Sequence, residues 1–250
     1  MRPAKLAALG AGAGAVGFAC YHAAAPTSQL FGPTVCRVPG AGRRVALTYD
    51  DGPNPGATEA ILELLDRHGA RATFFVIGRF AELEPDLVRA IAARGHAVGN
   101  HTWSHPSLPT TSDTSLRDEL ARTRAAVEAA GVGFSEIEGR ALMRPPYGRR
   151  RPGTLRTLRE EGYAPVMWSI TCYDWRRTVT ARAIARRAGR AGDGDIVLLH
   201  DGSDRGIGAD RSKTVAATEV VLDRLGSAGY AFATVPELVA AGGSSATSAK

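Results

Sequence analysis

The stretch VALTYDDGP, residues 45–53, decides the fold of this chain. The apolar run Val45–Leu47 is typical of a buried strand, and the sequence GPNPG at residues 52–56 cannot continue a strand. Asp50 and Asp51 therefore lie where a buried strand opens into a loop. Two adjacent carboxylates at such a place repel each other and are partly desolvated, so they need a nearby cation or proton. Taken alone, the pair could also be an exposed Asp-Asp-Gly turn.

Composition favours one globular domain. With 250 residues, 44% of them hydrophobic and 22% charged, the chain can bury a sizeable core as a single α/β domain. The formal net charge is +6, to which Arg2 and Lys5 contribute two charges. The basic residues are not interleaved with aromatic residues, so we expect no nucleic-acid partner. A preference for an anionic polymer remains open.

Residues 1–25 have the features of an export signal. Arg2 and Lys5 form a positive amino-terminal region, residues 6–18 form an apolar Ala/Gly-rich region, and Ala23–Ala25 resembles a cleavage site. The segment could instead stay uncleaved as an anchor, since about 20 residues suffice to span a bilayer. We therefore expect a secreted or cell-envelope protein that touches a membrane only through this segment, if it is not cleaved.

Cys36 and Cys172 would be the only cysteines of a chain cleaved after Ala25. In an oxidising compartment the two could pair as a disulfide. Two separate buried thiols are an equal alternative, and neither cysteine has the spacing of a metal site.

Strand-like and helix-like stretches alternate from Arg43 onward. Strands are predicted at 45–50, 72–77, 97–100, 141–143, 164–170, 195–200 and 230–234, and helices at 58–68, 85–94, 115–130, 154–161, 180–190, 213–225 and 236–240. This alternation predicts an α/β fold with a parallel sheet. We expect an irregular (β/α) barrel of about seven parallel strands over residues 43–240, with an open doubly wound sheet as the alternative. Residues 26–42 would be a linker and residues 241–250 a disordered tail.

Polar side chains occur at the same place in several of these βα units. Asp50 and Asp51 follow the first strand, His101 the third, Arg144 the fourth, Thr171–Asp174 the fifth and His200-Asp201 the sixth. In a parallel barrel these strand ends open on one face, where active sites are built.

His101 and His105 are spaced four residues apart, which would place both imidazoles on one face of a single helical turn. With a carboxylate from elsewhere, two such imidazoles suit a divalent metal that keeps open coordination positions. A pair of surface or capping histidines is the alternative. The nearby Asp50-Asp51 pair favours the metal site.

Five ordered motifs resemble those of the polysaccharide deacetylases, the NodB-homology domains of carbohydrate esterase family four. They are TYDDGP at 48–53, HTWSH at 101–105, RPPYG at 144–148, DW at 174–175 and LLH at 198–200, within a resemblance that covers residues 43–240. The resemblance implies an exported metal-dependent hydrolase that removes N-acetyl groups from an amino-sugar polymer such as peptidoglycan or chitin oligomers. O-deacetylation of acetylxylan and a non-catalytic glycan-binding module are the alternatives.

The resemblance also implies a role for each matched residue. Asp51, His101 and His105 would hold a divalent metal, zinc first, with cobalt, nickel or manganese as alternatives. The other implied roles are Asp50 as catalytic base, Arg144 as the residue that holds this base, Tyr147 as oxyanion donor through its backbone N–H, His200 as general acid, and Trp175, Asp174 and Tyr147 as substrate-groove residues. The partner would be an acetylated polysaccharide or oligosaccharide, and nothing requires more than a monomer.

The chain departs from the family pattern at Thr171. The family commonly has an aspartate three residues before the Asp174-Trp175 pair, where it orients the catalytic histidine. A threonine can hydrogen-bond an imidazole but cannot offset its positive charge. Either Asp174 or Asp201 would then support His200, or the acid would be weaker, in which case Thr171→Asp would raise the rate.

Overall fold

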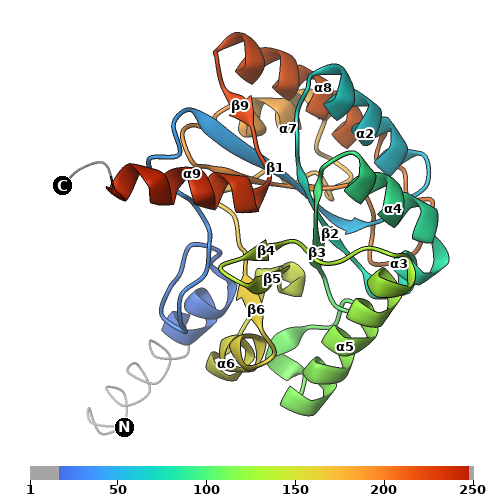
Figure 1. Ribbon diagram of the computed structural model, residues 1–250, viewed down its shortest axis with the longest axis vertical. Helices are drawn as coiled ribbons and strands as arrows, with labels where there is room; N and C mark the ends of the chain where they lie inside the picture. Colours follow the sequence, from blue (N-terminus) through green and yellow to red (C-terminus); the bar gives the residue numbers. More distant parts are fainter. Residues whose placement is uncertain (1–16, 248–250) are drawn as a thin grey trace, which may run out of the picture.

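One sheet runs through the computed structural model, which describes residues 17–247 (Figure 1). Its strands are β1 (Arg44–Gly52), β2 (Thr73–Val76), β3 (Ala97–Asn100), β4 (Glu136–Ile137), β5 (Arg140–Met143), β6 (Tyr163–Pro165), β7 (Ile170–Thr171), β8 (Ile196–His200) and β9 (Ala231–Phe232). The strand order is β4–β5–β3–β2–β1–β8–β7, with β6 paired to β5 and β9 paired to β1. Every strand pair is parallel except β4–β5. The predicted α/β fold with a mostly parallel sheet is confirmed.

Helices surround this sheet (Figure 1). They are α2 (Ala57–Arg67), α3 (Gly78–Leu83), α4 (Pro85–Ala93), α5 (Asp113–Ala129), α6 (Pro152–Glu160), α7 (Ala181–Ala188), α8 (Ser212–Ser227) and α9 (Val235–Thr247), with two 3₁₀ turns, η1 (Leu108–Thr110) and η2 (Pro146–Gly148). The apolar stripe of α2 is buried, as its spacing predicts. Helix α5 begins earlier than expected because Ser112 caps it, its hydroxyl accepting the Ser115 N–H at 3.1 Å.

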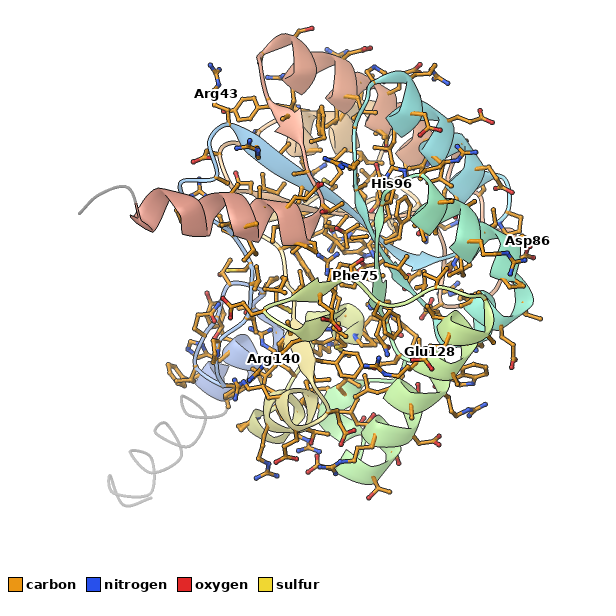
Figure 2. All side chains as sticks on the ribbon, in the orientation of Figure 1. Arg43, Phe75, Asp86, His96, Glu128 and Arg140 are labelled. Atoms are coloured by element: carbon orange, nitrogen blue, oxygen red, sulfur yellow. The ribbon has the colours of Figure 1, made fainter. Side chains whose placement is uncertain are left out.

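Strand β1 is buried on both faces. Val45, Leu47 and Tyr49 belong to the cluster that packs against the helices, whereas Ala46 belongs to the inner cluster with Phe75. Figure 2 shows Phe75 near the centre of the molecule. A parallel strand covered on both faces has a near-continuous apolar sequence, which is why this stretch identifies the fold.

The predicted barrel does not close, because β6 and β7 do not pair. The expected strand 164–170 is two short strands, and the chain between them turns to other partners. Val166 pairs instead with Val35 of the amino-terminal extension, and the Arg144 guanidinium donates to the carbonyls of Val166 and Met167 at 3.3 and 3.1 Å. A side chain therefore satisfies backbone groups that a neighbouring strand would otherwise bind.

Helix α9 corrects the expected disordered tail, since it continues through residues 241–247. Leu238 is fully buried in the inner cluster, and Gly242 lies so close to Val38 that a β-carbon there would collide with it. Packing therefore overrides a composition that favours disorder. Residues 248–250 lie outside the described residues.

Only the end of the predicted export signal lies within the described residues. Residues 17–24 are helical, and the buried Arg150 donates to the carbonyls of Ala25 and Ser28 at 2.7 and 2.8 Å. Residues 1–16 are outside the described range. Within residues 17–247, no helix has both the length and the apolar character that a membrane span requires. Cys36 and Cys172 are both free thiols, and Cys172 is buried.

His96 predicts an acid-sensitive stability. Its side chain is 5% exposed, its Nδ1 accepts the Ala72 N–H at 3.3 Å, and burial lowers its pKa from 6.5 to about 4. As the pH falls, His96 is protonated in the unfolded chain at a higher pH than in the folded chain. The free energy of unfolding therefore decreases as the pH falls from 6.5 toward 4, by about 2 kcal/mol at pH 5. Urea unfolding at pH 7 and pH 5 should show that His96→Asn, which keeps an acceptor, loses about 2 kcal/mol less than the wild type over this range. An identical pH dependence in both proteins would rule this out.

Candidate active site

The carboxyl ends of neighbouring strands meet at one edge of the sheet. Asp50 of β1 is in register with Phe75 of β2 and His200 of β8, and Val76 is in register with Asn100 of β3. The residues that follow these strands therefore converge. They line a groove of about 1090 Å³, above the roughly 300–1,000 Å³ of an ordinary small-molecule pocket. A chain-like ligand fits such a groove.

A β-bulge explains how two adjacent aspartates serve the same site. The register of β1 shifts between Asp50 and Gly52, and Asp51 has a φ of 70°. Successive strand residues normally point to opposite faces, and a bulge re-aims one of them. Asp50 keeps the inward direction of Thr48, while Asp51 turns toward the histidines.

The HTWSH motif is not a helical turn, which corrects the expected geometry. Residues 101–107 form a loop, and Thr102 and His105 have φ values of 67° and 63°. The loop is held from within, since Asn100 Oδ1 accepts the Thr102 N–H at 2.7 Å and the Thr102 hydroxyl accepts the His105 N–H at 3.2 Å. These bonds bring the His101 and His105 ring centroids to 4.9 Å.

Asp51, His101 and His105 form a cluster that fits a divalent metal. Asp51 Oδ1 lies 3.5 Å from His101 Nε2 and 3.3 Å from His105 Nε2, and the three ligand atoms lie within 4.8 Å of one another. Asp51 Oδ1 is buried without a hydrogen-bond partner, a costly state that a cation would relieve. The Arg144 carbonyl accepts the proton of His101 Nδ1 at 2.7 Å, which leaves Nε2 free to ligate.

The protonation states of this cluster agree with a ligand set. Burial opposes the ionisation of Asp51, but the neighbouring imidazoles outweigh it and hold its pKa below the usual range. Burial, reinforced by the charge of His101, lowers the pKa of His105 to about 4. At neutral pH the cluster therefore offers an ionised carboxylate and a neutral His105 imidazole.

Asp50 is paired with a fully buried arginine. Arg144 Nη1 donates to Asp50 Oδ1 at 2.7 Å and to the Thr48 hydroxyl at 2.7 Å, and its guanidinium lies over the Phe75 ring at 4.2 Å from the centroid. Asp50 Oδ2 is 3.8 Å from His101 Nε2. One oxygen of Asp50 is therefore held while the other faces the cluster.

Asp174, not a residue at position 171, supports His200. Its two oxygens accept from His200 Nδ1 and from the His200 backbone N–H, both at 2.8 Å. Burial disfavours the imidazolium, but the Asp174 carboxylate outweighs it and raises the pKa of His200 to about 9. The Thr171 hydroxyl instead accepts from Trp168 Nε1 at 2.8 Å. The departure at Thr171 therefore does not leave His200 unsupported, and the reason to expect a gain from Thr171→Asp disappears.

Tyr147 and Trp175 form walls of the groove. Tyr147 is 52% exposed, has a φ of 57°, and packs its ring against His105 at 4.4 Å between centroids. Trp175 is 43% exposed and meets the His200 ring edge-on at 5.1 Å. Tyr147 thus lies beside the cluster and Trp175 beside His200, whereas Asp174, the third residue predicted for the groove, is buried and does not line it.

Asp204 is a site residue that the sequence did not identify. It accepts the Tyr147 hydroxyl at 2.9 Å, and its Oδ2 lies 3.6 Å from His105 Nδ1. Asn54, which is 1% exposed, holds the surrounding loop by donating to the carbonyls of Asp201 and Ala209 and accepting the Gly208 N–H. Asn54 lies in the GPNPG breaker cluster, a signal that could have marked it, whereas Asp204 has no pattern around it.

We expect Asp204→Asn to weaken metal binding about tenfold, because a carboxylate facing the second nitrogen of a ligating histidine raises its basicity. Zn²⁺ titration against a competing chelator measures the change. Asp210→Asn, on the same loop, is the control and should keep the wild-type dissociation constant. Equal dissociation constants for all three proteins would contradict a role for Asp204.

Comparison with known proteins agrees with the site. A sequence profile of the polysaccharide deacetylase family matches residues 37–166. The chain is 37% identical over 206 residues to a peptidoglycan-N-acetylglucosamine deacetylase of Bacillus cereus, covering 81% of this chain and 91% of that protein. It is 36% identical over 202 residues to a chitooligosaccharide deacetylase of a Bradyrhizobium species, covering 78% and 90%.

The fold has solved counterparts as well. The crystal structure of the Bc1960 peptidoglycan N-acetylglucosamine deacetylase superposes with a TM-score of 0.73 at 31% identity, covering 81% of this chain and 91% of that one. Motif order, fold and sequence identity thus agree. The chain belongs to the polysaccharide deacetylase family.

Proposed function

We propose that this chain is a metal-dependent hydrolase that removes N-acetyl groups from an amino-sugar polymer of the peptidoglycan or chitin type. One observation carries the proposal: the Asp51–His101–His105 cluster lies beside two proton-transfer pairs, Asp50–Arg144 and Asp174–His200. The named relatives act on peptidoglycan and on chitooligosaccharides.

Asp51, His101 and His105 would hold the metal, for which we propose zinc. Two imidazoles and a carboxylate suit zinc, and cobalt, nickel or manganese could substitute. When bound, such a cation supplies Lewis acidity that polarises the acetamide carbonyl and makes water easier to deprotonate. Three protein ligands leave room for substrate and water.

Asp50 would take the proton from the attacking water. Arg144 holds Oδ1 at 2.7 Å, so Oδ2 remains for the proton, on the side of the metal ligands. A positioned proton acceptor of this kind typically contributes about 10²–10⁴ in rate.

His200 would give a proton to the departing amine. An amine is a poor leaving group unless it is protonated as the C–N bond breaks, and an imidazolium with a pKa of about 9 is still charged at neutral pH. Asp174 binds Nδ1, which leaves Nε2 as the donating nitrogen. Base and acid are thus different groups held by different partners, Arg144 for Asp50 and Asp174 for His200.

Tyr147 and Trp175 would position the substrate. Tyr147 lies on the rim of the groove, and its backbone has the left-handed conformation that non-glycine residues rarely adopt. We assign its backbone N–H as the donor to the oxyanion of the tetrahedral intermediate. Trp175 would line the sugar site beside His200, whereas Asp174, whose side chain is buried, would act only through His200.

A binding module alone has no use for two buried proton-transfer pairs, which makes that alternative weaker. For location, we propose export through residues 1–25, with residues 43–240 as the catalytic domain, acting in the cell envelope or outside the cell. We propose a monomer that acts on an acetylated polysaccharide and binds no nucleic acid.

The first test is acetate release from chitin oligomers, peptidoglycan and acetylxylan. We expect release from the amino-sugar polymers, loss with a chelator and recovery on adding Zn²⁺. Asp50→Asn should keep its metal and lower kcat about 10³-fold. Release from acetylxylan alone would favour O-deacetylation, and full activity in Asp50→Asn would refute the assigned base.

The second test is the pH profile of Asp174→Asn. Because the carboxylate raises the pKa of His200 to about 9, its loss should move the alkaline limb of kcat to lower pH and lower the neutral-pH rate. Thr171→Val is the matched control, since Thr171 contacts Trp168, and its alkaline limb should stay in place. An unmoved limb in Asp174→Asn would show that His200 is not the acid.

A further inference from the structure

A basic segment of the chain without acidic residues contributes to the groove. Residues 175–192, here called the basic segment, contain no aspartate or glutamate but six arginines: Arg176, Arg177, Arg182, Arg186, Arg187 and Arg190. The segment follows β7 and includes α7, and all of these arginines except Arg187 are exposed. Within residues 17–247 none of the six forms an ion pair with a carboxylate. Exposed arginines elsewhere often do, as Arg117 does with Glu160 and Glu161.

The positive charge continues into the groove itself. Arg177 and Trp175 of the basic segment line the groove, as do Arg149 after η2 and Arg205 on the loop after β8. Three separate parts of the chain thus bring a guanidinium group to one cleft. Charges from unconnected segments that converge in this way are typical of a site that binds an anion.

The carboxylates on the outer part of the same groove are already engaged. Asp204 accepts the Tyr147 hydroxyl at 2.9 Å, and Asp210 accepts the Ser212 N–H at 2.9 Å. Arg149 and Arg205 make no ion pair within the described residues. The guanidinium groups therefore remain available to a ligand.

We propose that Arg149, Arg177 and Arg205, extended by the basic segment, bind carboxylates carried by the glycan chain itself. Guanidinium groups bind carboxylates in a bidentate, geometrically specific way. The substrate class is then an acidic N-acetylated amino-sugar polymer, such as peptidoglycan strands with free carboxylates, in preference to neutral chitin. This inference rests on the proposed function and narrows its substrate.

The position of Trp175 favours a glycan over a membrane surface as the ligand of these arginines. Trp175 is the first residue of the basic segment, and its exposed ring lies 5.1 Å from the His200 ring, centroid to centroid. A polymer bound in the groove would pass this apolar platform and reach the arginines without leaving the surface. A flat lipid surface would not reach the arginines inside the groove.

Three matched substrates test the proposal: peptide-free peptidoglycan strands, the same strands with their carboxylates converted to amides, and chitohexaose. The double variant Arg177→Gln/Arg205→Gln should raise KM about fivefold on the acidic strands, with kcat unchanged and less than a twofold change on the neutral substrates. Added salt should raise the wild-type KM only for the acidic strands. Arg140→Gln is the control, because Arg140 is the exposed first residue of β5, does not line the groove and should change nothing.

Equal KM values for acidic and amidated strands, or an equal rise on all three substrates, would overturn the proposal. So would anionic vesicle binding that the double variant loses while its KM on strands is unchanged, since the surface would then serve a membrane. Strand binding is also measured by sedimentation with the Asp50→Asn protein, which requires no turnover. If no substrate releases acetate, the proposed function fails, and charge-dependent sedimentation still decides the arginine site separately.

Discussion

The Arg144 guanidinium is the interaction on which the rest of the structure depends. It is fully buried, and its donors reach Asp50, Thr48 and the carbonyls of Val166 and Met167. A buried charge is stable only when it is paired and its hydrogen bonds are satisfied. The Arg144 side chain binds the backbone carbonyls that lie between β6 and β7, which do not pair with each other. It also holds the Asp50 carboxylate at the carboxyl edge of the sheet. Removing it would leave both an unpaired carboxylate and unsatisfied backbone groups.

Strained backbone at the strand ends is the second constraint. Asp51, Thr102, His105 and Tyr147 all have positive φ, and such conformations cost roughly 1–3 kcal/mol each for non-glycine residues. At Thr102 and His105 they persist because the buried hydrogen bonds of Asn100 and Thr102 hold the loop. The parallel sheet thus stabilises the fold enough to offset the strain in the loops at its carboxyl edge. These loops direct their side chains toward one point.

The strands, the helices and the residues at the strand ends can be predicted from the sequence, because apolar runs and the residues that end strands and helices are local signals. It failed where geometry depends on partners far along the chain. The four-residue spacing of His101 and His105 predicts a helical turn, but Asn100 and Thr102 fold the segment as a loop. For the support of His200 the sequence leaves Asp174, Asp201 and a weaker acid as alternatives, and only the hydrogen bond from His200 Nδ1 to Asp174 decides between them. Asp204 was missed because its partners, Tyr147 and His105, are remote in sequence.

The mispredicted details do not change the assignment of the metal site, because the charges at the carboxyl edge of the sheet favour a cation there. Asp50, Asp51 and Asp174 supply three carboxylates, against which stand one guanidinium and one imidazolium. Asp201 lies behind them, and burial, together with the charges of Asp51 and Asp50, raises its pKa to about 7. The contribution of the neighbouring carboxylates to this shift shows that negative charges gather at this edge of the sheet. A dication bound by Asp51 and the two histidines would offset this negative charge. Arg149, Arg177 and Arg205 form no ion pair within the described residues and are left to an acidic glycan.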